Sequence, residues 1–395
     1  MQIRNINEIN IAEKRVLIRC DLNVPIQNGV IQSDARILAS LPTIELALHK
    51  KAKVIIMSHL GRPKNESYEK KYSLFPIFEY LKKKINYTKV YFSSDYSKVI
   101  PINSGELLIL ENVRFNPGEL TNDNILSKRY STLCDIFVMD AFGTAHRKQA
   151  STYGIGEFVK IACAGPLLIS EITMLKKVLK NPKRPMVSII GGSKVSTKFN
   201  VLNNLSNISD IVIVGGGIAN TFLAIDYNVG KSLHEPEFIS QAKKLRDNYN
   251  NIMIPIDSRI GKNFSESEKS IIKLPSNIKQ NEEIMDFGDN TIEKVVNIIK
   301  QAKTILWNGP VGVFEFPHFR KGTEKIAKAI ANNSNFSVAG GGDTLSVIDM
   351  FRIKNKISYI STGGGAFLEF IEGKKLPAID MLEKNFFQQQ LNNIF

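Results

Sequence analysis

Basic side chains stand where four apolar stretches in the first half of the chain come to an end. Arg19 closes the first stretch, His59 and Arg62 follow the second, Arg114 follows the third, and Arg147 follows the fourth. An arginine guanidinium matches carboxylate and phosphate oxygens through two parallel hydrogen bonds. Several such groups brought close together would form a binding site for a small anion that carries more than one negative charge.

Glycine clusters follow five apolar, β-branched stretches in the second half of the chain. The clusters are GGSK at 191–194, GGG at 215–217, NGP at 308–310, GGGD at 340–343 and GGG at 363–365. Glycine allows the backbone to approach a phosphate closely, and the start of a following helix offers unpaired N–H groups and the positive end of its dipole. This pattern predicts a binding site for nucleotide phosphates. Two binding sites, one for the anion and one for the nucleotide, suggest that a group is transferred between the two ligands.

Charged residues at these turns have both a functional and a plainer interpretation. Lys194 and Lys198 are predicted in the first turn of a helix, where the dipole disfavours cations, so we interpret both as phosphate ligands. Asp343 would repel a phosphate unless a cation bridged the two, which makes it a magnesium candidate; a helix N-cap is the alternative. Glu315 could accept hydrogen bonds from ribose hydroxyls, although a surface carboxylate is the commoner case.

Arg36 is predicted just inside a helix that follows the first apolar stretch, from where it could reach the anion site. A helix-surface ion pair, which contributes little, is the alternative. Any single arginine is more often a solvated surface charge, and a lone histidine is more often structural. The coincidence of basic groups at four stretches favours a binding site.

The elements that would position these residues alternate between strands and helices along the chain. Residues 37–51, ILASLPTIELALHKK, space their apolar side chains for one helix face, and Asp34 could cap that helix. The alternation predicts an α/β fold, with a mostly parallel sheet covered by helices on both faces in each half. Ligands of such sheets bind beyond the carboxyl ends of the strands, where both sets of candidate residues stand.

A length of 395 residues exceeds what one hydrophobic core normally supports and predicts two domains. Residues 165–179 have the pattern of one helix, which Pro182 and Pro185 end, and we interpret this helix as the connection between the domains. A short helix-like stretch beyond Gly373 could pack back on the first domain.

The composition argues against several classes of protein. With 43% hydrophobic and 23% charged residues the chain is typical of a soluble globular protein, and no run approaches the roughly 18 apolar residues of a membrane span. The start shows no targeting segment, and the scattered cysteines lack CxxC spacing, so we expect a cytoplasmic protein without disulfides. The net charge of +14 comes from lysines spread along the chain without a recognition module, so we expect no nucleic-acid partner.

The chain resembles the phosphoglycerate kinase family in an ordered set of motifs that covers essentially its whole length. The motifs are RCDLNVP, SHLGRP, LLILENVRF, DAFGTAHR, GGSKVSTK, GGGIANTFL, ILWNGPVGVFE, GGGDT and STGGGAFLEFIEGK. The resemblance implies two Rossmann-like three-layer domains with parallel sheets, joined by an interdomain helix. The implied limits are 1–164 for the 3-phosphoglycerate domain, 165–181 for the helix, 182–372 for the nucleotide domain and 373–395 for a segment that packs back on the first domain.

The resemblance also assigns roles to the candidate residues, in a protein expected to be a monomer. It implies that 3-phosphoglycerate or 1,3-bisphosphoglycerate is held by Asp21, Asn23, Arg36, His59, Arg62, Arg114 and Arg147. It implies that ADP or ATP is held by Gly191, Gly192, Lys194, Lys198, Gly215, Gly216, Asn308, Glu315, Gly340, Gly341, Gly342, Asp343, Thr344, Gly363, Gly364 and Gly365. Arg36 and Lys194 would act on the transferring phosphoryl group, and Asp343 would hold Mg²⁺ through the nucleotide.

The implied reaction needs no general base. The attacking carboxylate has a pKa of about 4 or lower and is already ionised at neutral pH. Catalysis would then consist of alignment and of neutralising the charge that develops on the equatorial oxygens, through Arg36, Lys194, Mg²⁺ and the helix start at Gly365. With the substrates on separate domains, closure would have to bring them together and expel water.

Three positions depart from the family pattern. Asp289, in DFGDNT, replaces a usual proline and leaves the rigidity of that loop open; Gln149 stands where histidine is common, and Ser170 where lysine is usual. Two rival functions remain to be tested. A different acid kinase or nucleotide-dependent ligase would show no preference for 3-phosphoglycerate, and a basic RNA- or surface-binding protein would show no turnover.

Overall fold

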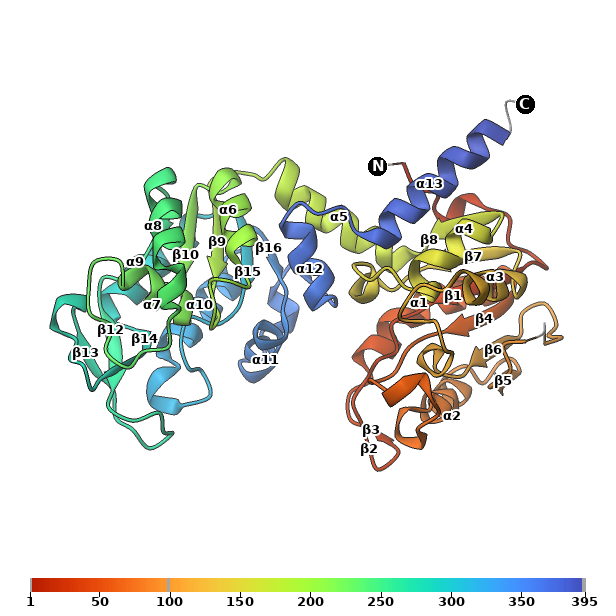
Figure 1. Ribbon diagram of the computed structural model, residues 1–395, viewed down its shortest axis with the longest axis horizontal. Helices are drawn as coiled ribbons and strands as arrows, with labels where there is room; N and C mark the ends of the chain where they lie inside the picture. The colour runs from red at the N-terminus through yellow and green to blue at the C-terminus, as the bar shows by residue number, and fades with distance from the viewer. Residues whose placement is uncertain (1, 98–99, 393–395) are drawn as a thin grey trace. The chain divides into compact units, whose positions relative to one another are not determined.

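The computed structural model describes residues 2–97 and 100–392 of the chain. Contacts between Cα atoms divide the chain into unit 1, Met1–Thr173 with Lys375–Phe395, and unit 2, Met174–Lys374. The helix predicted at 165–179 is present as α5 (Pro166–Lys180), and the division falls inside it. Figure 1 colours unit 1 from red to yellow, together with the blue C-terminal helix α13 (Pro377–Asn392), and unit 2 from green to blue.

Unit 1 contains a parallel sheet that includes the apolar stretches ending in basic residues. Its strands lie in the order β5 (Val90–Ser93), β6 (Leu107–Leu110), β4 (Lys53–Met57), β1 (Arg15–Arg19), β7 (Ile136–Met139) and β8 (Ile161–Ala164). β6, β4, β1 and β7 are direct neighbours in parallel register. Their carboxyl ends therefore meet at one edge of the sheet, as the sequence predicts.

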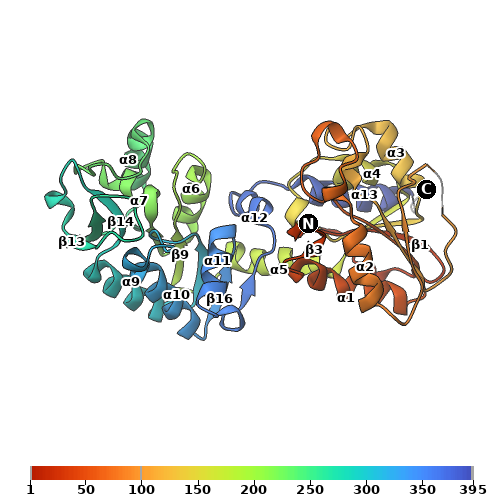
Figure 2. The same ribbon diagram turned by 90° about the horizontal axis from the view of Figure 1, so that it is seen from below.

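Helices cover both faces of this sheet and give three layers. Figure 2 shows α1 (Ala35–His49) and α2 (Phe75–Lys84) on one side, and α3 (Asn124–Thr132), α4 (Ile155–Phe158) and α13 on the other. Asn385 of α13 accepts a hydrogen bond from Ala162 N at 2.9 Å and donates to the carbonyls of Gly156 (3.3 Å) and Val159 (3.2 Å). These bonds join α13 to β8 and to the segment around α4.

Asp34 occupies the N-cap position of α1, as predicted, but its carboxylate is used elsewhere. Asp34 does precede the helix, but its side chain makes no capping hydrogen bond. Its Oδ2 instead accepts a hydrogen bond from the Tyr80 hydroxyl at 2.7 Å. The carboxylate is thus used to tie the start of α1 to α2, a tertiary contact that no local pattern could show.

Unit 2 contains a second parallel sheet, which includes all five stretches that end in glycine clusters. Its order is β11 (Ile252–Met253), β10 (Ile211–Val214), β9 (Met186–Ile190), β15 (Thr304–Asn308), β16 (Phe336–Ala339) and β17 (Tyr359–Ile360). Figure 2 shows α6 (Phe199–Ile208), α7 (Gly216–Leu223) and α8 (Ile239–Asn248) on one side, and α9 (Asp289–Gln301), α10 (Lys321–Asn332) and α11 (Gly342–Met350) on the other. α12 (Gly364–Ile371) packs against α6.

Two small antiparallel elements accompany the parallel sheets and were not predicted. Unit 2 has a sheet in the order β13 (Ile271–Lys273), β12 (Ser258–Gly261) and β14 (Glu283–Phe287). Unit 1 has the hairpin β2 (Ile26–Gln27) and β3 (Val30–Ile31). These strands are at or below the usual strand length, so they carry too little periodicity to be recognised from sequence.

Each sheet lies in its own hydrophobic core. In unit 1 the core includes Ile18, Ile44 and Val54. In unit 2 it includes Trp307 and Ile326. None of the helices within residues 2–97 and 100–392 combines the length and the apolar character that a membrane crossing requires.

Candidate functional site

The loops that follow β1 and β4 in unit 1 are joined by the candidate anion-binding residues. Arg36, in the first turn of α1, donates from Nη1 to Asp21 Oδ1 (3.2 Å) and to the Asn23 carbonyl (3.0 Å). Asn23 Oδ1 accepts a hydrogen bond from Gly61 N at 2.9 Å. Arg114, on the short 3-10 helix η4 (Val113–Phe115), donates to the Gly61 carbonyl. The structure therefore brings residues from three strand ends into one cluster.

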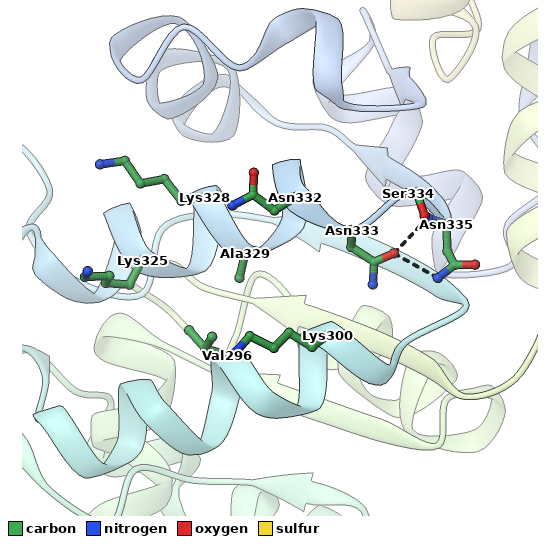
Figure 3. A pocket seen from close by; sticks show the side chains of 9 residues that line it. All are labelled: Val296, Lys300, Lys325, Lys328, Ala329, Asn332, Asn333, Ser334 and Asn335. Carbon is green, nitrogen blue, oxygen red and sulfur yellow. Dashed lines mark hydrogen bonds between the residues drawn. The ribbon is translucent and has the colours of Figure 1, made fainter.

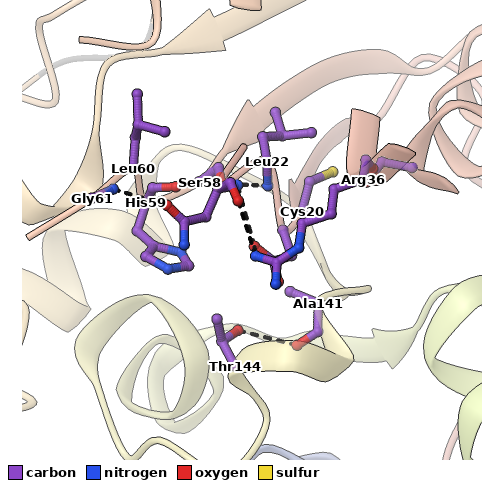
Figure 4. A network of polar contacts seen from close by, with 12 residues as sticks. Cys20, Leu22, Arg36, Ser58, His59, Leu60, Gly61, Ala141 and Thr144 are labelled. Carbon is purple, nitrogen blue, oxygen red and sulfur yellow. Dashed lines mark hydrogen bonds and ion pairs between the residues drawn. The ribbon is translucent and has the colours of Figure 1, made fainter. Parts of the chain in front are cut away.

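His59 lies deeper in the same cluster and is almost fully buried. Its Nδ1 is 3.3 Å from Nη2 of Arg19, and its Nε2 is 3.5 Å from Nη1 of Arg147, which follows β7. Figure 4 shows the His59 ring pointing from the loop after β4 toward the segment that carries Ala141 and Thr144. The fourth strand end thus contributes to the cluster as well.

The cluster holds more positive charge than its carboxylates balance. Burial, and then the charges of Arg147 and Arg19, lower the pKa of Arg114 to about 10. Burial and Arg19 also lower the pKa of Arg147, which Asp21 opposes. The exposed Arg62 contributes to both shifts, which places it close to this cluster. Since like charges disfavour one another here, an anion bound among them would be stabilised.

A cavity of about 420 Å³ opens beside the glycine-rich turns of unit 2. Its apolar wall includes Leu233, Met285, Val311 and Phe314, and the exposed Phe264 also lines it. Four of the sequence-assigned residues line the cavity directly: Gly192, Gly216, Glu315 and Asp343. An apolar cavity with a few polar groups is the usual form of a small-molecule site.

Other assigned glycines have a packing role that the structure makes clear. A Cβ at Gly191 would lie 1.7 Å from the Pro310 carbonyl oxygen, so these turns pack backbone against backbone. Gly216 has φ +62° and lies against the Gly192 carbonyl, where a Cβ would be 2.8 Å away. Glycine at 191 therefore permits close packing, while Gly216 both packs closely and lines the cavity.

The helix predicted to contain Lys194 and Lys198 begins later than expected, which corrects that prediction. α6 starts at Phe199, Lys198 is its N-cap residue, and Lys194 lies exposed in the preceding loop. Ser196 donates from its backbone N (2.8 Å) and Oγ (2.6 Å) to Glu235, which holds the segment as a loop. The two lysines therefore do not share a helix face.

Lys198 is half-buried, in contrast to the exposed Lys194. Its Nζ donates to the Gly191 carbonyl at 2.5 Å. Burial lowers the pKa of Lys198 to about 8, and the charge of Asp343 opposes that shift. Lys198 and Asp343 are thus close enough to interact electrostatically.

The remaining assigned residues stand at the starts of α11 and α12. The Asn308 amide donates to the Gly340 carbonyl at 2.7 Å, and Thr344 Oγ1 accepts from Gly309 N at 2.7 Å. Gly340, Gly341, Gly342 and Gly363, Gly364, Gly365 form or precede the first turns of these helices. A Cβ at Gly342 or Gly364 would meet nothing within 4 Å, so both helix starts are sterically open to a ligand.

The residues around Asp343 fit a magnesium ion held together with a nucleotide. Asp343 is an exposed carboxylate in the first turn of α11 and lines the cavity. Mg²⁺ is usually bound by one or two carboxylates together with substrate phosphates. In the described part of the chain no three His, Cys, Asp or Glu side chains gather as a metal site of their own. The donor set therefore fits an ion that arrives with the phosphates.

Asp289, where the family commonly has proline, is anchored by two cations. Its Oδ1 lies 2.5 Å from Arg259 Nη2 and 2.8 Å from Lys321 Nζ. Arg259 is buried and also donates to the Phe287 carbonyl at 2.6 Å. Ion pairs thus hold the start of α9.

A second cavity of unit 2, of about 410 Å³, lies between α9 and α10 (Figure 3). It is lined by Lys300, in the last turn of α9, and by Lys325 and Lys328 of α10. Asn333 donates to the carbonyls of Ile299 (2.6 Å) and Ala302 at the end of α9. Lys300 balances the negative end of the α9 dipole, and Lys328 pairs with Glu324, so these two lysines have structural reasons of their own.

Residues that the sequence did not assign also belong to these sites. Arg19 was noted at a strand end but given no role, although it contacts His59. Its position after a buried strand is a signal that could have identified it. Leu233 and Phe264 line the cavity of unit 2 without any local pattern that marks them.

Comparison with known proteins supports the family resemblance that the sequence motifs show. A family model described as phosphoglycerate kinase matches residues 6–374. The chain is 76% identical over 386 residues to a phosphoglycerate kinase of Buchnera aphidicola subsp. Schizaphis graminum (strain Sg), with 98% of this chain and 100% of the relative covered. It is 60% identical over 393 residues to that of Buchnera aphidicola subsp. Baizongia pistaciae (strain Bp), with both chains fully covered.

Solved structures confirm the predicted α/β fold with parallel sheets. Phosphoglycerate kinase from Coxiella burnetii has a TM-score of 0.93 and 47% identity, covering 97% of this chain and 99% of that one. The enzyme from Pyrococcus horikoshii OT3 has a TM-score of 0.82 and 31% identity, covering 98% and 99%. The chain therefore belongs to the phosphoglycerate kinase family, whose members transfer a phosphoryl group between 1,3-bisphosphoglycerate and ADP.

Proposed function

We propose that unit 1 binds the three-carbon acid of this reaction at the edge where its central strands end. The residues are Asp21, Asn23, Arg36, His59, Arg62, Arg114 and Arg147. The observation that carries the assignment is the convergence of cations from adjacent strand ends, where burial and mutual repulsion lower the pKa values of Arg114 and Arg147. 3-Phosphoglycerate carries a carboxylate and a phosphate, and arginine forks match both groups.

The nucleotide is proposed to occupy the cavity of about 420 Å³ in unit 2. Its base would contact the apolar wall, its ribose would reach Glu315, and its phosphates would reach Lys194, Lys198 and the helix starts at 340–344 and 363–365. Mg²⁺ would be held by Asp343 together with those phosphates, where it would neutralise charge on the transferring group. The supporting features are the open first turns of α11 and α12 and the exposed carboxylate of Asp343.

The transfer step then needs positioning and charge stabilisation. The acceptor carboxylate is ionised at neutral pH, so no side chain has to remove a proton. Arg36 and Lys194 are proposed to stabilise the equatorial oxygens of the phosphoryl group in transit. Because the two substrates bind on different units, the reaction passes through a conformation in which they meet, with water excluded.

Domain limits of 1–164, 165–181, 182–372 and 373–395 are proposed, with a monomer in the cytoplasm as the working unit. A coupled assay of the purified chain tests the central proposal. MgATP consumption is expected with 3-phosphoglycerate and at most weakly with acetate. Equal turnover of both acids would indicate another acid kinase, and RNA binding without turnover would indicate a binding protein. Size-exclusion chromatography with light scattering tests the monomer.

A further inference from the structure

His59 lies between two groups that can only donate hydrogen bonds. Its Nδ1 is 3.3 Å from Arg19 Nη2, and its Nε2 is 3.5 Å from Arg147 Nη1. A guanidinium has no acceptor, and a neutral imidazole has one donating and one accepting nitrogen. The ring can therefore accept a hydrogen bond from only one of the two arginines.

Arg19 is the arginine that is held in place. It is completely buried, its Nε donates to Ser151 Oγ at 3.0 Å, and its Nη1 donates to the Cys20 carbonyl. Arg147 is only partly buried, and its contact with the ring is the longer one. Nδ1 is therefore the accepting nitrogen, and Nε2 carries the proton.

A buried carboxylate supports Arg19 from the other side. Ser151 donates from Oγ to Glu119 Oε1 at 2.6 Å and from its backbone N to Oε2 at 3.1 Å. Glu119 is completely buried. A buried guanidinium is tolerated when a counter-charge and hydrogen bonds compensate it. Glu119, Ser151 and Arg19 thus form a continuous chain that ends at Nδ1 of His59.

The charged groups that act on His59 come from four different elements. They are Arg19 at the end of β1, Arg36 on α1, Arg114 on η4 and Arg147 after β7. Burial contributes most, and with these four cations it holds the pKa of His59 well below its usual range. The ring is therefore uncharged at neutral pH. Its Nε2–H faces Arg147, which is itself only a donor, so a bound ligand has to supply the acceptor for this N–H.

We propose that Arg19 is a positioning residue that fixes His59 as the Nε2–H tautomer, so that an uncharged imidazole donates to an oxygen of the bound acid. This inference rests on the proposed function, because it takes His59 as part of the 3-phosphoglycerate site. The arginines supply charge to that site, and His59 supplies a hydrogen bond of fixed direction without adding a further cation.

Nitrogen-15 NMR of the His59 ring in the full chain tests the tautomer directly. The wild type is expected to keep Nδ1 unprotonated and Nε2 protonated between about pH 5 and 8. In Arg19→Met the ring is expected to populate both tautomers and to titrate closer to the ordinary histidine pKa of about 6.5. A wild-type ring that carries its proton on Nδ1, or that titrates near that value, would overturn the proposal.

Binding of 3-phosphoglycerate provides a functional readout. The ratio of the Kd of Arg19→Met to that of the wild type is measured at each pH, because the ionisation of the ligand then cancels. We expect binding about tenfold weaker at pH 8. The ratio is expected to shrink as the pH falls through about 6.5, because His59 of the variant then gains a proton and a charge. A ratio independent of pH would mean that Arg19 acts only through its own charge or through packing.

Two further variants keep this test decisive. Arg15→Met removes an arginine at the other end of β1, where it pairs with Asp135 at a partly exposed site, and is expected to leave His59 unchanged. Ser151→Ala keeps Arg19 but removes the acceptor of its Nε, and is expected to shift both readouts in the direction of Arg19→Met, by less. If circular dichroism and nucleotide affinity show that Arg19→Met does not fold, Ser151→Ala replaces it in both measurements. A wild type that binds no 3-phosphoglycerate would contradict the proposed function, while the NMR result would still decide the tautomer.

Discussion

Arg36 is the residue at which binding and catalysis are most easily separated. In the structure it contacts Asp21 and the Asn23 carbonyl, and its side chain is about one-third exposed. It is thus held by the loop that follows β1, yet it is accessible to a ligand. A guanidinium in that position can contribute more to the transition state than to the bound acid.

Arg36→Ala is expected to lower kcat by about 10³- to 10⁵-fold, the range of arginine residues that stabilise phosphoryl transfer. Nucleotide affinity is expected to stay near the wild-type value, because Arg36 lies in unit 1. Steady-state kinetics with 3-phosphoglycerate and MgATP measure both. A change confined to KM for 3-phosphoglycerate would show that Arg36 only binds the substrate.

Lys198 provides a second prediction at the scale of single residues. Its pKa of about 8 means that its charge is lost as the pH rises through that value. ATP affinity of the wild type is therefore expected to weaken above about pH 8, and Lys198→Met should lose this pH dependence. At pH 7 the variant should bind ATP about 10- to 100-fold more weakly, because such a loss corresponds to one hydrogen bond to a charged group.

The control for that prediction is Lys325→Met, in the cavity between α9 and α10. It removes a lysine charge from the same unit without touching the nucleotide cavity. Isothermal titration calorimetry with ATP, on the wild type and both variants at pH values below and above about 8, measures these affinities. The same loss of affinity in both variants would mean that only the overall charge of unit 2 matters.

At the scale of elements, the start of α9 shows how ion pairs hold a turn that usually contains proline. Asp289 pairs with the buried Arg259 and with Lys321, and these hydrogen bonds lower the pKa of Asp289. A carboxylate whose pKa is lowered by folding stabilises the folded state at pH values above the ordinary aspartate pKa of about 3.9. This stabilisation is lost as the pH falls below that value.

Asp289→Ala is expected to lower the free energy of unfolding by about 1 kcal/mol at neutral pH, because Arg259 keeps only its bond to the Phe287 carbonyl. Urea unfolding at neutral and acidic pH measures this, and the two proteins should converge in acid. Glu324→Ala, which removes an exposed pair within α10, should change stability by no more than about 0.5 kcal/mol. A difference that persists in acid would exclude the ion pairs as its cause.

At the scale of the whole molecule, the chain forms two units, and the last helix belongs to the first. α13 buries Leu382 completely, and Asn385 binds three backbone groups of unit 1. Residues far apart in sequence therefore share one core. The integrity of the acid site should depend on the C-terminal helix, since both lie in unit 1.

Leu382→Ala is expected to destabilise unit 1 by about 2 to 5 kcal/mol, as for other buried leucines. Affinity for 3-phosphoglycerate should fall under mild denaturant, while ATP affinity should hold. Leu391→Ala, on the same helix but 56% exposed, is the matched control and should be nearly neutral. Equal loss of both ligand affinities in Leu382→Ala would contradict the assignment of α13 to unit 1 alone.

The sequence by itself determined the strands that carry the candidate residues, the parallel arrangement of those strands and the residues at their ends. Continuous Val, Ile and Leu runs specify buried parallel strands, and the side chains that follow must lie at one edge of the sheet. Arg114, His59 and Arg147 could therefore be placed together before any coordinates. Family motifs then supplied the identity of the ligands, which spacing alone does not contain.

The tertiary structure decided what depends on contacts between distant segments. The Asp34 side chain binds Tyr80 instead of its own helix, Glu235 holds the loop of Lys194 and Lys198, and Arg19 contacts His59 from a neighbouring strand. These hydrogen bonds join residues that are 39 to 46 positions apart, so no local period reports them. The short antiparallel strands were missed for another reason, because strands of two to five residues show too little periodicity.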